Sequence, residues 1–304
     1  MVGEHQADLH RPMLEAPSRG MPAPEARTSC VLECVVNVSE GRDESVLRAI
    51  GGTAGSHLLD THADPHHHRG VFTLAGPQVE AAARRLVSEA VARIDLRTHR
   101  GSHPRLGAAD VVPFTPLEGS TFADALAARD RFARWAGDSL GVPCFVFGPE
   151  RSLPDVRRSA FTTLAPSTGP DRPHPSAGAV SVGARGLLVA YNLWLAPASD
   201  VKAARRVAAA IRGPGIRALG LELDGVAQVS CNLIDPLAVG PDAAFDAVAR
   251  HVEIARAELV GLLPVRVLGA IPSSRWRTLD LSPSRTIEAR LEQAGLDVAG
   301  RGGQ

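Results

Sequence analysis

The sequence predicts a mixed α/β (α+β) fold of two subdomains, each with the split β-α-β-β-α-β order of elements, and with a ligand groove between them. Three observations support this prediction. The 304 residues are enough for one large domain or two ordinary ones. The 44% hydrophobic and 22% charged residues are typical of a globular protein with a buried core. The same order of six elements also occurs twice along the chain, although the local sequences of the two rounds are dissimilar.

The first round opens with a valine-rich apolar run, which predicts a strand, and closes with another apolar strand. Between them the pattern indicates a helix, two short strands joined at a histidine-rich bend, and an amphipathic helix with Pro77 in its first turn. The predicted elements are a strand at 31–38, a helix at 43–54, strands at 57–62 and 70–75, a helix at 77–95 and a strand at 108–114.

The second round repeats this order. Ser199 or Asp200 is placed to cap its first helix, and Asp224-Gly225 is a good hairpin turn between two of its strands. The predicted elements are a strand at 187–195, a helix at 200–211, strands at 217–223 and 227–233, a helix at 241–258 and a closing strand at 265–269.

Between the rounds we expect a helix at 121–141, a strand at 142–147 and a long proline-rich segment at 149–178. Connections longer than about 12–15 residues without structure of their own are usually functional or disordered. Ligand clefts also favour domain interfaces. We therefore expect a binding site where this segment meets the loop around His103.

These elements divide the chain into a tail at 1–29, an N-terminal subdomain at 30–186 and a C-terminal subdomain at 187–304. The tail is rich in proline, so we expect it to be disordered, and it has no apolar segment of the kind a secretory signal needs. A formal net charge of zero gives no field that favours nucleic acid or membrane surfaces. No apolar run approaches the roughly 20 residues that span a bilayer. The four cysteines have no paired metal spacing, which favours a reduced, cytoplasmic protein.

The run 100–110 is the densest polar segment of the chain, and it combines His103 with two arginines, two glycines and a proline. It predicts a rigid loop that presents an imidazole beside positive charge. An unperturbed histidine pKa near ~6.5 suits proton transfer at neutral pH. Two interpretations stay open from the residues alone: a general acid/base, or a loop histidine that makes one structural hydrogen bond.

The bend between the first two short strands carries four histidines, at positions 62, 66, 67 and 68. Imidazoles gathered along a bend can converge on zinc. Consecutive histidines on an extended chain point to opposite faces, however, so a polar bend facing the substrate is the favoured interpretation and no metal is expected. Residues 37–42 either cap the following helix or offer backbone donors to a ligand, and the two roles are compatible.

Several familiar catalytic patterns are missing from the chain. It contains neither a phosphate-binding glycine loop ending in Gly-Lys-Ser/Thr nor a nucleotide fingerprint after a strand. A Gly-x-Ser-x-Gly elbow is also missing. These absences argue against kinases, dehydrogenases and common hydrolases, and leave noncovalent group transfer or binding.

Several motifs, in order, resemble those of the glutamate formimidoyltransferase family. Residues 32–41, LECVVNVSEG, resemble V-E-C-V-P-N-F-S-E-G, and residues 102–114, SHPRLGAADVVPF, resemble E-H-P-R-M-G-A-L-D-V-C-P-F. Residues 227–233, AQVSCNL, resemble A-Q-V-S-T-N-L. Shorter matches fall at 58–60, 169–170, 175–179, 183–185 and 190–192, so the resemblance extends from 31 to about 292. It implies the formiminotransferase domain without the cyclodeaminase domain that is fused to it in animals.

The resemblance implies transfer of a formimino group from N-formimino-L-glutamate to N5 of tetrahydrofolate, in histidine degradation and one-carbon metabolism. It implies a homodimer with small-molecule substrates and tetrahydrofolate as co-substrate, without a metal. His103 matches the family's catalytic histidine, which acts as base and then as acid. The folate-contacting segment matches Gly169, Pro170, Asp171, Arg172, Pro173, His174, Pro175, Ser176, Ala177 and Gly178.

The substrates carry carboxylates, for which bidentate guanidinium groups are suited. Arg69, Arg105 and Arg185 are the candidates to bind them. Asp60 or Asp110 is expected to bind the amino-amide edge of the pterin or to orient His103.

The chain departs from the family pattern at the bend and in the folate segment. His62 stands where the family commonly has Asp, His68 where it has Asn, and Ala177 where it has Trp. Two alternatives follow: a 5-formyltetrahydrofolate–glutamate formyltransferase, and a noncatalytic folate-binding protein. A metal-dependent hydrolase built on the histidine bend is a further alternative.

Overall fold

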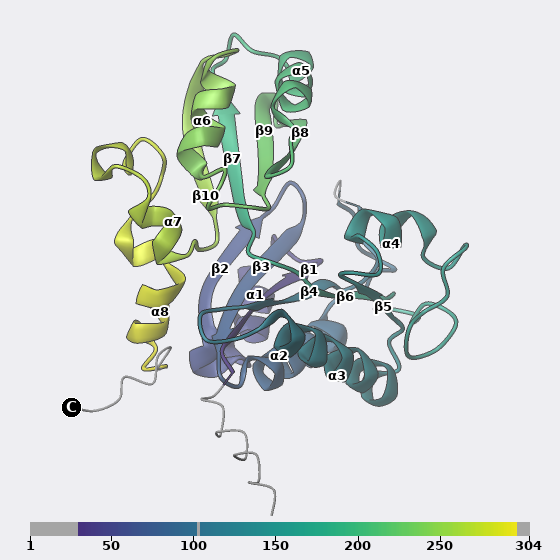
Figure 1. The fold of residues 1–304 in the computed structure, drawn as a ribbon. Coiled ribbons are helices and arrows are strands. Elements are labelled where there is room, and N and C mark those ends of the chain that lie inside the picture. The colour runs from purple at the N-terminus through teal and green to yellow at the C-terminus, as the bar shows by residue number, and fades with distance from the viewer. Residues whose placement is uncertain (1–29, 102–103, 297–304) are drawn as a thin grey trace, which may run out of the picture.

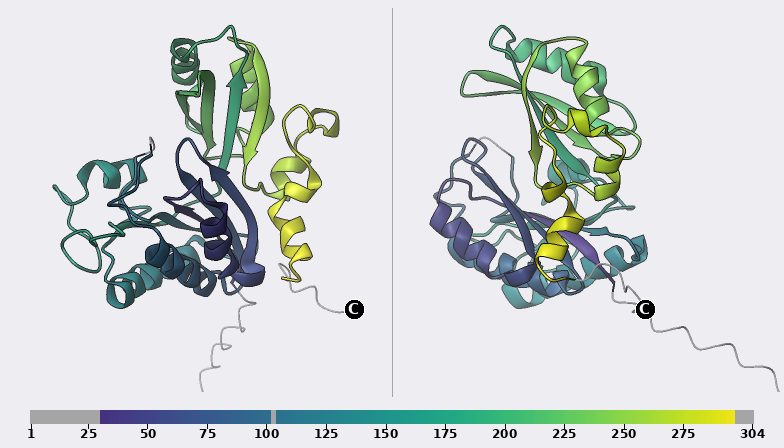
Figure 2. Two further views of the ribbon diagram at one scale, coloured as in Figure 1. Left: turned by 180° about the vertical axis from the view of Figure 1, so that it is seen from behind. Right: turned by 90° about the vertical axis from the view of Figure 1, so that its left-hand side faces the viewer.

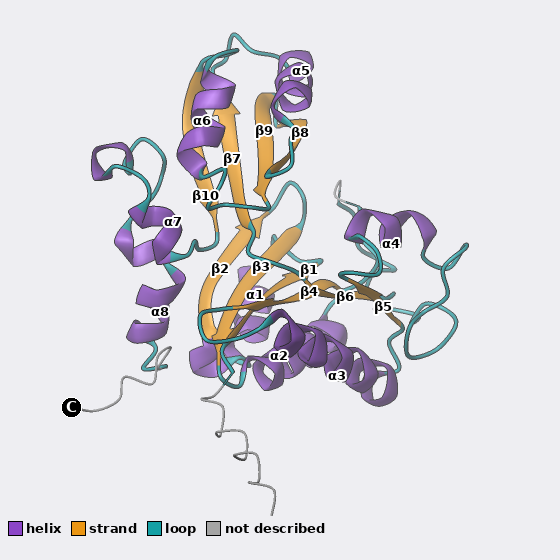
Figure 3. Ribbon diagram, in the orientation of Figure 1, coloured by secondary structure: helices purple, strands orange, loops and turns teal. Residues whose placement is uncertain are grey.

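The computed structural model describes residues 30–101 and 104–296, and the predicted tail at 1–29 falls outside them. The ten strands of this part form two sheets, one of six strands and one of four (Figures 1 and 3). The first half of the chain contains β1 (Leu32–Val38), α1 (Glu44–Gly52), β2 (Leu58–Asp64), β3 (Arg69–Gly76), α2 (Val79–Arg93), β4 (Ala109–Pro116), α3 (Phe122–Leu140), β5 (Cys144–Phe147), α4 (Leu153–Ser159) and β6 (Val180–Ala184).

The second half contributes the smaller sheet and the last helices. Its elements are β7 (Val189–Leu195), α5 (Val201–Ile211), β8 (Ile216–Leu223), β9 (Val226–Leu233), α6 (Pro241–Ala249), β10 (Ile254–Val260), α7 (Val265–Gly269) and α8 (Ile287–Gln293). Among the described residues, no helix is long and apolar enough to cross a membrane.

Both predicted rounds of β-α-β-β-α-β are confirmed. The six-stranded sheet has the order β2-β3-β1-β4-β6-β5, and the four-stranded sheet has the order β10-β7-β9-β8. In each round the first strand lies between the third and fourth, and all neighbours within a round are antiparallel. In the larger sheet β6 and β5 extend this unit with parallel pairing beside β4.

The core of the first half lies between one face of its sheet and α1, α2 and α3. Alternate strand residues such as Phe72 and Phe114 point into it, and the ring of Phe114 meets that of Phe132 of α3. This period-2 alternation leaves the opposite face of the sheet for polar residues, among them Glu33, Thr73 and Thr115, all of which are buried.

The prediction for the end of the second round is wrong in its boundaries. The helix expected at 241–258 ends at Ala249, and β10 follows it. Ala257 and Leu259 are buried while Arg256 is exposed, which is the alternation of a strand. The strand expected at 265–269 is the short helix α7, which begins after Pro264, a residue suited to a helix start.

The segment 149–178, expected to lack regular structure, contains α4. Ser152 and Asp155 form a reciprocal capping box that begins this helix. A further strand, β6, was not predicted and runs between β4 and β5. Gly183 in β6 is required there, because a Cβ would lie 2.0 Å from the ring of Phe147.

The chain crosses from the first sheet to the second and then returns. After β10, α7 packs against the core of the second sheet, and α8 then runs back beside β2 (Figures 1 and 2). Ile287 and Leu291 of α8 pack against Leu59 and Ala75 of the six-stranded sheet. The last helix therefore contributes to the packing of the first half.

Candidate functional site

The loop before β4 is fastened to the end of β1. The backbone N–H of Ser39 donates to the carbonyl oxygen of Ala108 (2.8 Å), and its hydroxyl donates to that of Gly107 (2.8 Å). Within the loop, the backbone N–H of Leu106 donates to Oδ1 of Asp110 (2.7 Å). These contacts hold the loop at the sheet edge where β1 ends and β4 begins.

A small hollow lies at this edge. It is lined by Val38, Ser39, Arg69, Arg105 and Asp110, which lie so close together that no water molecule fits between them. Three predicted substrate-binding residues, Arg69, Arg105 and Asp110, therefore come together. The predicted catalytic residue His103 lies outside the described residues.

Arg69 forms one positive wall of the hollow. Its Nε and Nη2 donate to Oδ1 of Asn37 at 3.0 and 2.5 Å. Burial lowers the pKa of Arg69 to about 10, while the nearby carboxylate of Asp110 favours the charged form. A guanidinium with that pKa is still a cation at pH 7, so this wall attracts anions.

Arg105 forms a second positive wall and crosses to the β2–β3 turn. Its Nη2 donates to the carbonyl oxygen of His67 (3.1 Å), and its Nη1 donates to that of His68 (3.3 Å). The same Nη1 contacts the ring of His99. His99 is not among the predicted site residues, because nothing in its local sequence marks it.

The carboxylate of Asp110 mainly holds the loop before β4 in place, because both of its oxygens accept hydrogen bonds from other residues. Its Oδ2 accepts a hydrogen bond from Nη2 of Arg157 (2.6 Å), while its Oδ1 is taken by the loop backbone. Nη1 of Arg157 donates to the carbonyl oxygen of Pro104 (2.5 Å). Arg157 therefore ties both ends of the loop to α4. It was missed because α4 was not predicted, although the Ser-x-x-Asp pattern at 152–155 is a signal for that helix.

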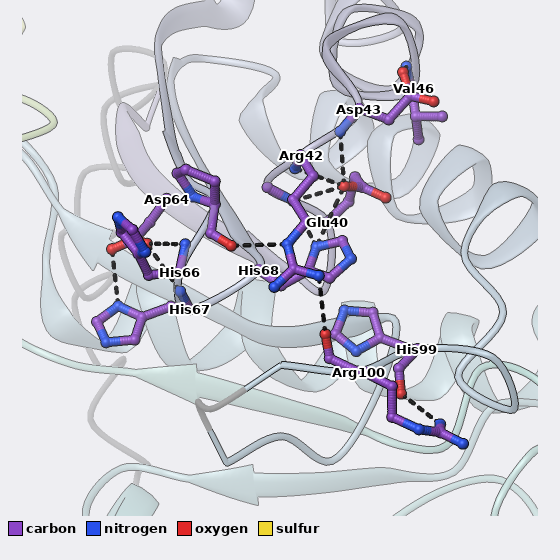
Figure 4. Close-up of polar contacts among 12 residues, drawn as sticks. Glu40, Arg42, Asp43, Val46, Asp64, His66, His67, His68, His99 and Arg100 are labelled. Atoms are coloured by element: carbon purple, nitrogen blue, oxygen red, sulfur yellow. Dashed lines mark hydrogen bonds and ion pairs between the residues drawn. The ribbon is translucent and has the colours of Figure 1, made fainter. Parts of the chain in front are cut away.

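The histidine bend is organised around Asp64 (Figure 4). Its Oδ1 accepts the backbone N–H groups of His66 and His67, each at 2.9 Å, and Nδ1 of His67 lies 2.8 Å from its Oδ2. Burial opposes ionisation, but these hydrogen bonds outweigh it and lower the pKa of Asp64 to about 2. Within 30–101 and 104–296, no group of three His, Cys, Asp or Glu residues is arranged to hold a metal ion.

In the turn after β1, the backbone N–H groups donate to a side chain of the same turn. Oε1 of Glu40 accepts the backbone N–H groups of Gly41, Arg42 and Asp43 at 2.8, 2.7 and 3.0 Å (Figure 4). The N–H of Gly41 also reaches Nδ1 of His68 at 3.1 Å. The backbone N–H groups of residues 41–43 are therefore already bonded within the protein, and Asp43 is the cap of α1.

The pKa of His68 lies below its ordinary value. Burial is the largest cause; Glu40 acts against it, and the nearby cations Arg42 and Arg105 add to it. Because its Nδ1 accepts the N–H of Gly41, the ring proton belongs on Nε2. The ring stacks on His99 with a centroid distance of 4.1 Å.

The predicted folate segment is joined by backbone contacts to the loop before β4. The N–H of Ala108 donates to the carbonyl oxygen of Ala177 (2.9 Å). Gly178 has a φ of +69°, and a Cβ there would lie 2.2 Å from the carbonyl oxygen of Leu106. The expectation that this segment meets the loop after His103 is therefore confirmed for its last residues.

The side chains of this segment have different environments. Ala177 is buried in the first core, so its side chain is not at the surface. His174 is half-buried, and its Nδ1 accepts the N–H of Ala177 at 3.0 Å. Ser176 and Gly178 are also half-buried, and the exposed members are Gly169, Pro170, Asp171, Arg172, Pro173 and Pro175.

Arg185 and Asp60 do not join the hollow. The backbone N–H of Arg185 donates to the carbonyl oxygen of Phe114 (3.1 Å), four positions along β4 from Asp110. At about 3.3 Å per strand residue this is a separation of roughly 13 Å. Asp60 pairs with Thr73 further along the same face of the sheet.

A larger hollow of about 290 Å³ lies in the second half, against α5 and the end of α6. It is lined by Ala203, Arg206, Val207, Ala210, His251 and Val252. None of the predicted site residues lines it. The groove expected between the subdomains stays a prediction.

Comparison with known proteins gives the site its context. The model of the N-terminal subdomain of the formiminotransferase domain matches residues 31–185. The chain is 34% identical over 271 residues to the glutamate formimidoyltransferase of Streptococcus pyogenes serotype M1, which covers 78% of this chain and 90% of that protein. It is 33% identical over 311 residues to the formimidoyltransferase-cyclodeaminase of Sus scrofa, which covers 88% of this chain and 57% of that protein. The glutamate formimidoyltransferase of Thermoplasma acidophilum is 29% identical over 301 residues, covering 87% and 98%. The chain therefore belongs to the formiminotransferase family.

Proposed function

We propose that this protein is a glutamate formimidoyltransferase, which moves the formimino group of N-formimino-L-glutamate to N5 of tetrahydrofolate. This reaction belongs to histidine degradation and one-carbon metabolism. The observation that carries the proposal is the hollow between Arg69 and Arg105, beside the loop that contains His103 in the sequence. Family membership supports the same conclusion.

The charge of the hollow suits one end of such a substrate. Small-molecule pockets usually enclose roughly 300–1,000 Å³, whereas the side chains that line this hollow leave no room for a water molecule as they stand. A carboxylate therefore enters only when Arg69 and Arg105 move apart, and a whole folate does not fit. Arg69 and Arg105 are the residues that bind this carboxylate, because guanidinium groups pair with carboxylates through two parallel hydrogen bonds.

His103 moves the proton in this proposal. Its imidazole takes the proton from N5 as N5 bonds to the formimino carbon, and gives it to the glutamate nitrogen as the old C–N bond breaks. One C–N bond forms, one breaks and one proton moves between the two nitrogens, so the reaction needs no covalent intermediate with the enzyme. Beyond this proton transfer, the enzyme accelerates the reaction by holding both substrates in contact.

The proposal includes the wider arrangement of the protein. The segment Gly169–Gly178 contacts the folate, and the loop backbone that it touches supports this role. The subdomains are 30–186 and 187–304, and the enzyme is a cytoplasmic homodimer that uses no metal. The presence of two separate sheets supports this division.

A second candidate is transfer of a formyl group from 5-formyltetrahydrofolate to glutamate. The positive charges of Arg69, Arg105 and Arg157 act on one another at this site. They favour a neutral formyl group over a formimino group, which is basic and carries a proton more readily.

One assay with both donors tests the proposal. Purified protein is incubated with N-formimino-L-glutamate and tetrahydrofolate, and in parallel with 5-formyltetrahydrofolate and glutamate. We expect 5-formiminotetrahydrofolate in the first reaction. Product in the second reaction alone assigns the formyl reaction. Tight folate binding by folded protein with no product in either reaction would mean that the protein is a folate binder and not a transferase.

A further inference from the structure

The guanidinium of Arg105 is surrounded by hydrogen-bond acceptors. Its Nη1 lies 2.7 Å from Nε2 and 3.0 Å from Nδ1 of His99, and the carbonyl oxygens of His67 and His68 accept from Nη2 and Nη1. A guanidinium has donors only. His99 can take part in this contact as a neutral imidazole, because an imidazolium would place a second positive charge about 3 Å from the first.

The surroundings of His99 keep it neutral. Burial, followed by the charges of Arg105 and His68, lowers the pKa of His99 to about 4, although Glu40 acts in the opposite direction. His99 also stacks on His68 with the ring planes 30° apart. Figure 4 shows these two rings beside the turn that Glu40 holds.

The backbone leaves room for this arrangement at Gly101. A Cβ on Gly101 would lie 2.5 Å from Nη2 of Arg105 and 3.0 Å from the carbonyl oxygen of His67. Any other residue would displace the guanidinium or the turn. Gly101 is therefore fitted to one position of this side chain.

We propose that His99 is a positioning residue, whose uncharged imidazole holds Arg105 at the hollow so that Arg105 and Arg69 bind one carboxylate of an N-substituted glutamate. The inference rests on the proposed function for the identity of the substrate. The contact between His99 and Arg105 stands on the geometry alone. His99 does not touch the substrate and acts through Arg105.

The first test measures the protonation of His99 and needs no activity. Imidazole resonances of isotope-labelled protein are followed from pH 4 to pH 8 in the wild type and in Arg105→Gln. We expect His99 to stay neutral down to about pH 4 in the wild type. In Arg105→Gln its pKa should rise toward the ordinary value near ~6.5. A wild-type His99 that titrates near that ordinary value overturns the proposal.

The second test separates substrate binding from chemistry. In His99→Ala we expect the KM for the glutamate donor to rise about tenfold, the effect of one lost charge-assisted hydrogen bond, with kcat within about twofold. The KM for the folate should not change. His99→Gln keeps an uncharged acceptor and should recover most of the loss, whereas His99→Lys should lose more. His251→Ala, an exposed histidine of the second half, is the control and should resemble the wild type.

The outcomes of the two tests differ for the two proposals. An unchanged KM in His99→Ala, or a His99→Gln variant no better than His99→Ala, overturns the positioning role. If the wild type turns over neither donor, the proposed function fails. The resonance titration then still decides whether His99 holds Arg105.

Discussion

Nδ1 of His66 lies 3.1 Å from Oδ1 of Asp224, and this pair joins the β2–β3 turn to the β8–β9 turn. It therefore links the two sheets at their hairpin tips. Both side chains are accessible, with 38% and 76% of their surface exposed. Asp224 has a φ of +49°, a left-handed conformation that Asp and Asn tolerate better than other residues.

We expect the His66–Asp224 pair to contribute little to stability. Exposed ion pairs are typically worth about 0.2–1 kcal/mol. A double-mutant cycle with His66→Ala and Asp224→Asn should give a coupling energy in that range, measured by urea unfolding. The coupling should fade in 1 M salt, where the Debye length is about 3 Å. A coupling above about 2 kcal/mol would contradict the view of this pair as a weak, solvated contact.

Arg157→Ala should destabilise the protein much more. The carboxylate of Asp110 is almost fully buried, and the Arg157 side chain is 20% exposed. Removing one partner of a buried pair costs about 3–5 kcal/mol because the other charge is left uncompensated. The residual exposure of Arg157 places the expected loss near the lower end. Arg158→Ala, whose side chain is 68% exposed on the same helix, is the matched control and should change unfolding by less than about 1 kcal/mol.

His103→Ala should abolish most of the turnover and leave folate affinity unchanged. Loss of a general acid/base lowers the rate by about 10²–10⁴. Single-turnover kinetics measure the chemical step, and equilibrium titration with folate measures binding. An active variant would reject the assignment of His103 as the proton carrier.

The order of elements followed from the sequence because apolar periodicity and turn residues are local signals. The same locality explains the error at 241–258. Val252 is compatible with the apolar face of a longer helix and also with a residue just before a strand. The chain forms the strand β10 because it pairs there with β7, a contact that the local sequence does not show. β6 was missed because its five residues are a short apolar run with no hairpin turn beside it.

The site was predictable where its residues belong to motifs. Arg69 and Arg105 do meet at one hollow. Arg157 and His99 were not predictable in the same way, because the role of Arg157 arises from a contact between distant parts of the chain, and His99, six positions from Arg105, belongs to no motif. Arg157 lies 47 positions from Asp110 in sequence, and nothing local indicates that pairing. Arg185 carries an equally good local signal but lies along the sheet, away from the hollow.

Asp64→Asn should destabilise the protein in a pH-dependent way. The pKa of Asp64 is about 2 in the folded protein, and about 3.9 is expected when the protein is unfolded. The carboxylate therefore contributes stability that is fully present above about pH 4 and is lost as pH falls through 2. This shift corresponds to about 2 kcal/mol. Urea unfolding at pH 7 and pH 3 should show a smaller difference between the two proteins at pH 3. A difference that is the same at both pH values would mean that Asp64 titrates normally.

Glu33→Gln should stabilise the protein at high pH. Glu33 is 3% exposed on β1, opposite Thr115, whose hydroxyl is buried with no hydrogen-bond partner among the described residues. Burial raises the pKa of Glu33 to about 7, although Arg185 opposes this shift, and Glu288 adds to it. Because the folded pKa exceeds the unfolded value of about 4.3, the favourable contribution of the protonated acid is present below pH 4 and is lost as pH rises through 7.

The test of Glu33 compares unfolding free energies at pH 5 and pH 8. The shift corresponds to about 3 kcal/mol, so Glu33→Gln should gain up to that amount relative to the wild type between these pH values. Glu44→Gln, whose side chain is 86% exposed, is the control and should show no such gain. If the Glu33→Gln difference is equal at both pH values, Glu33 keeps one pKa in the folded and unfolded protein. The carboxyl would then be solvated in the folded state, and the polar face beside Arg185 would be open to water rather than sealed by α8.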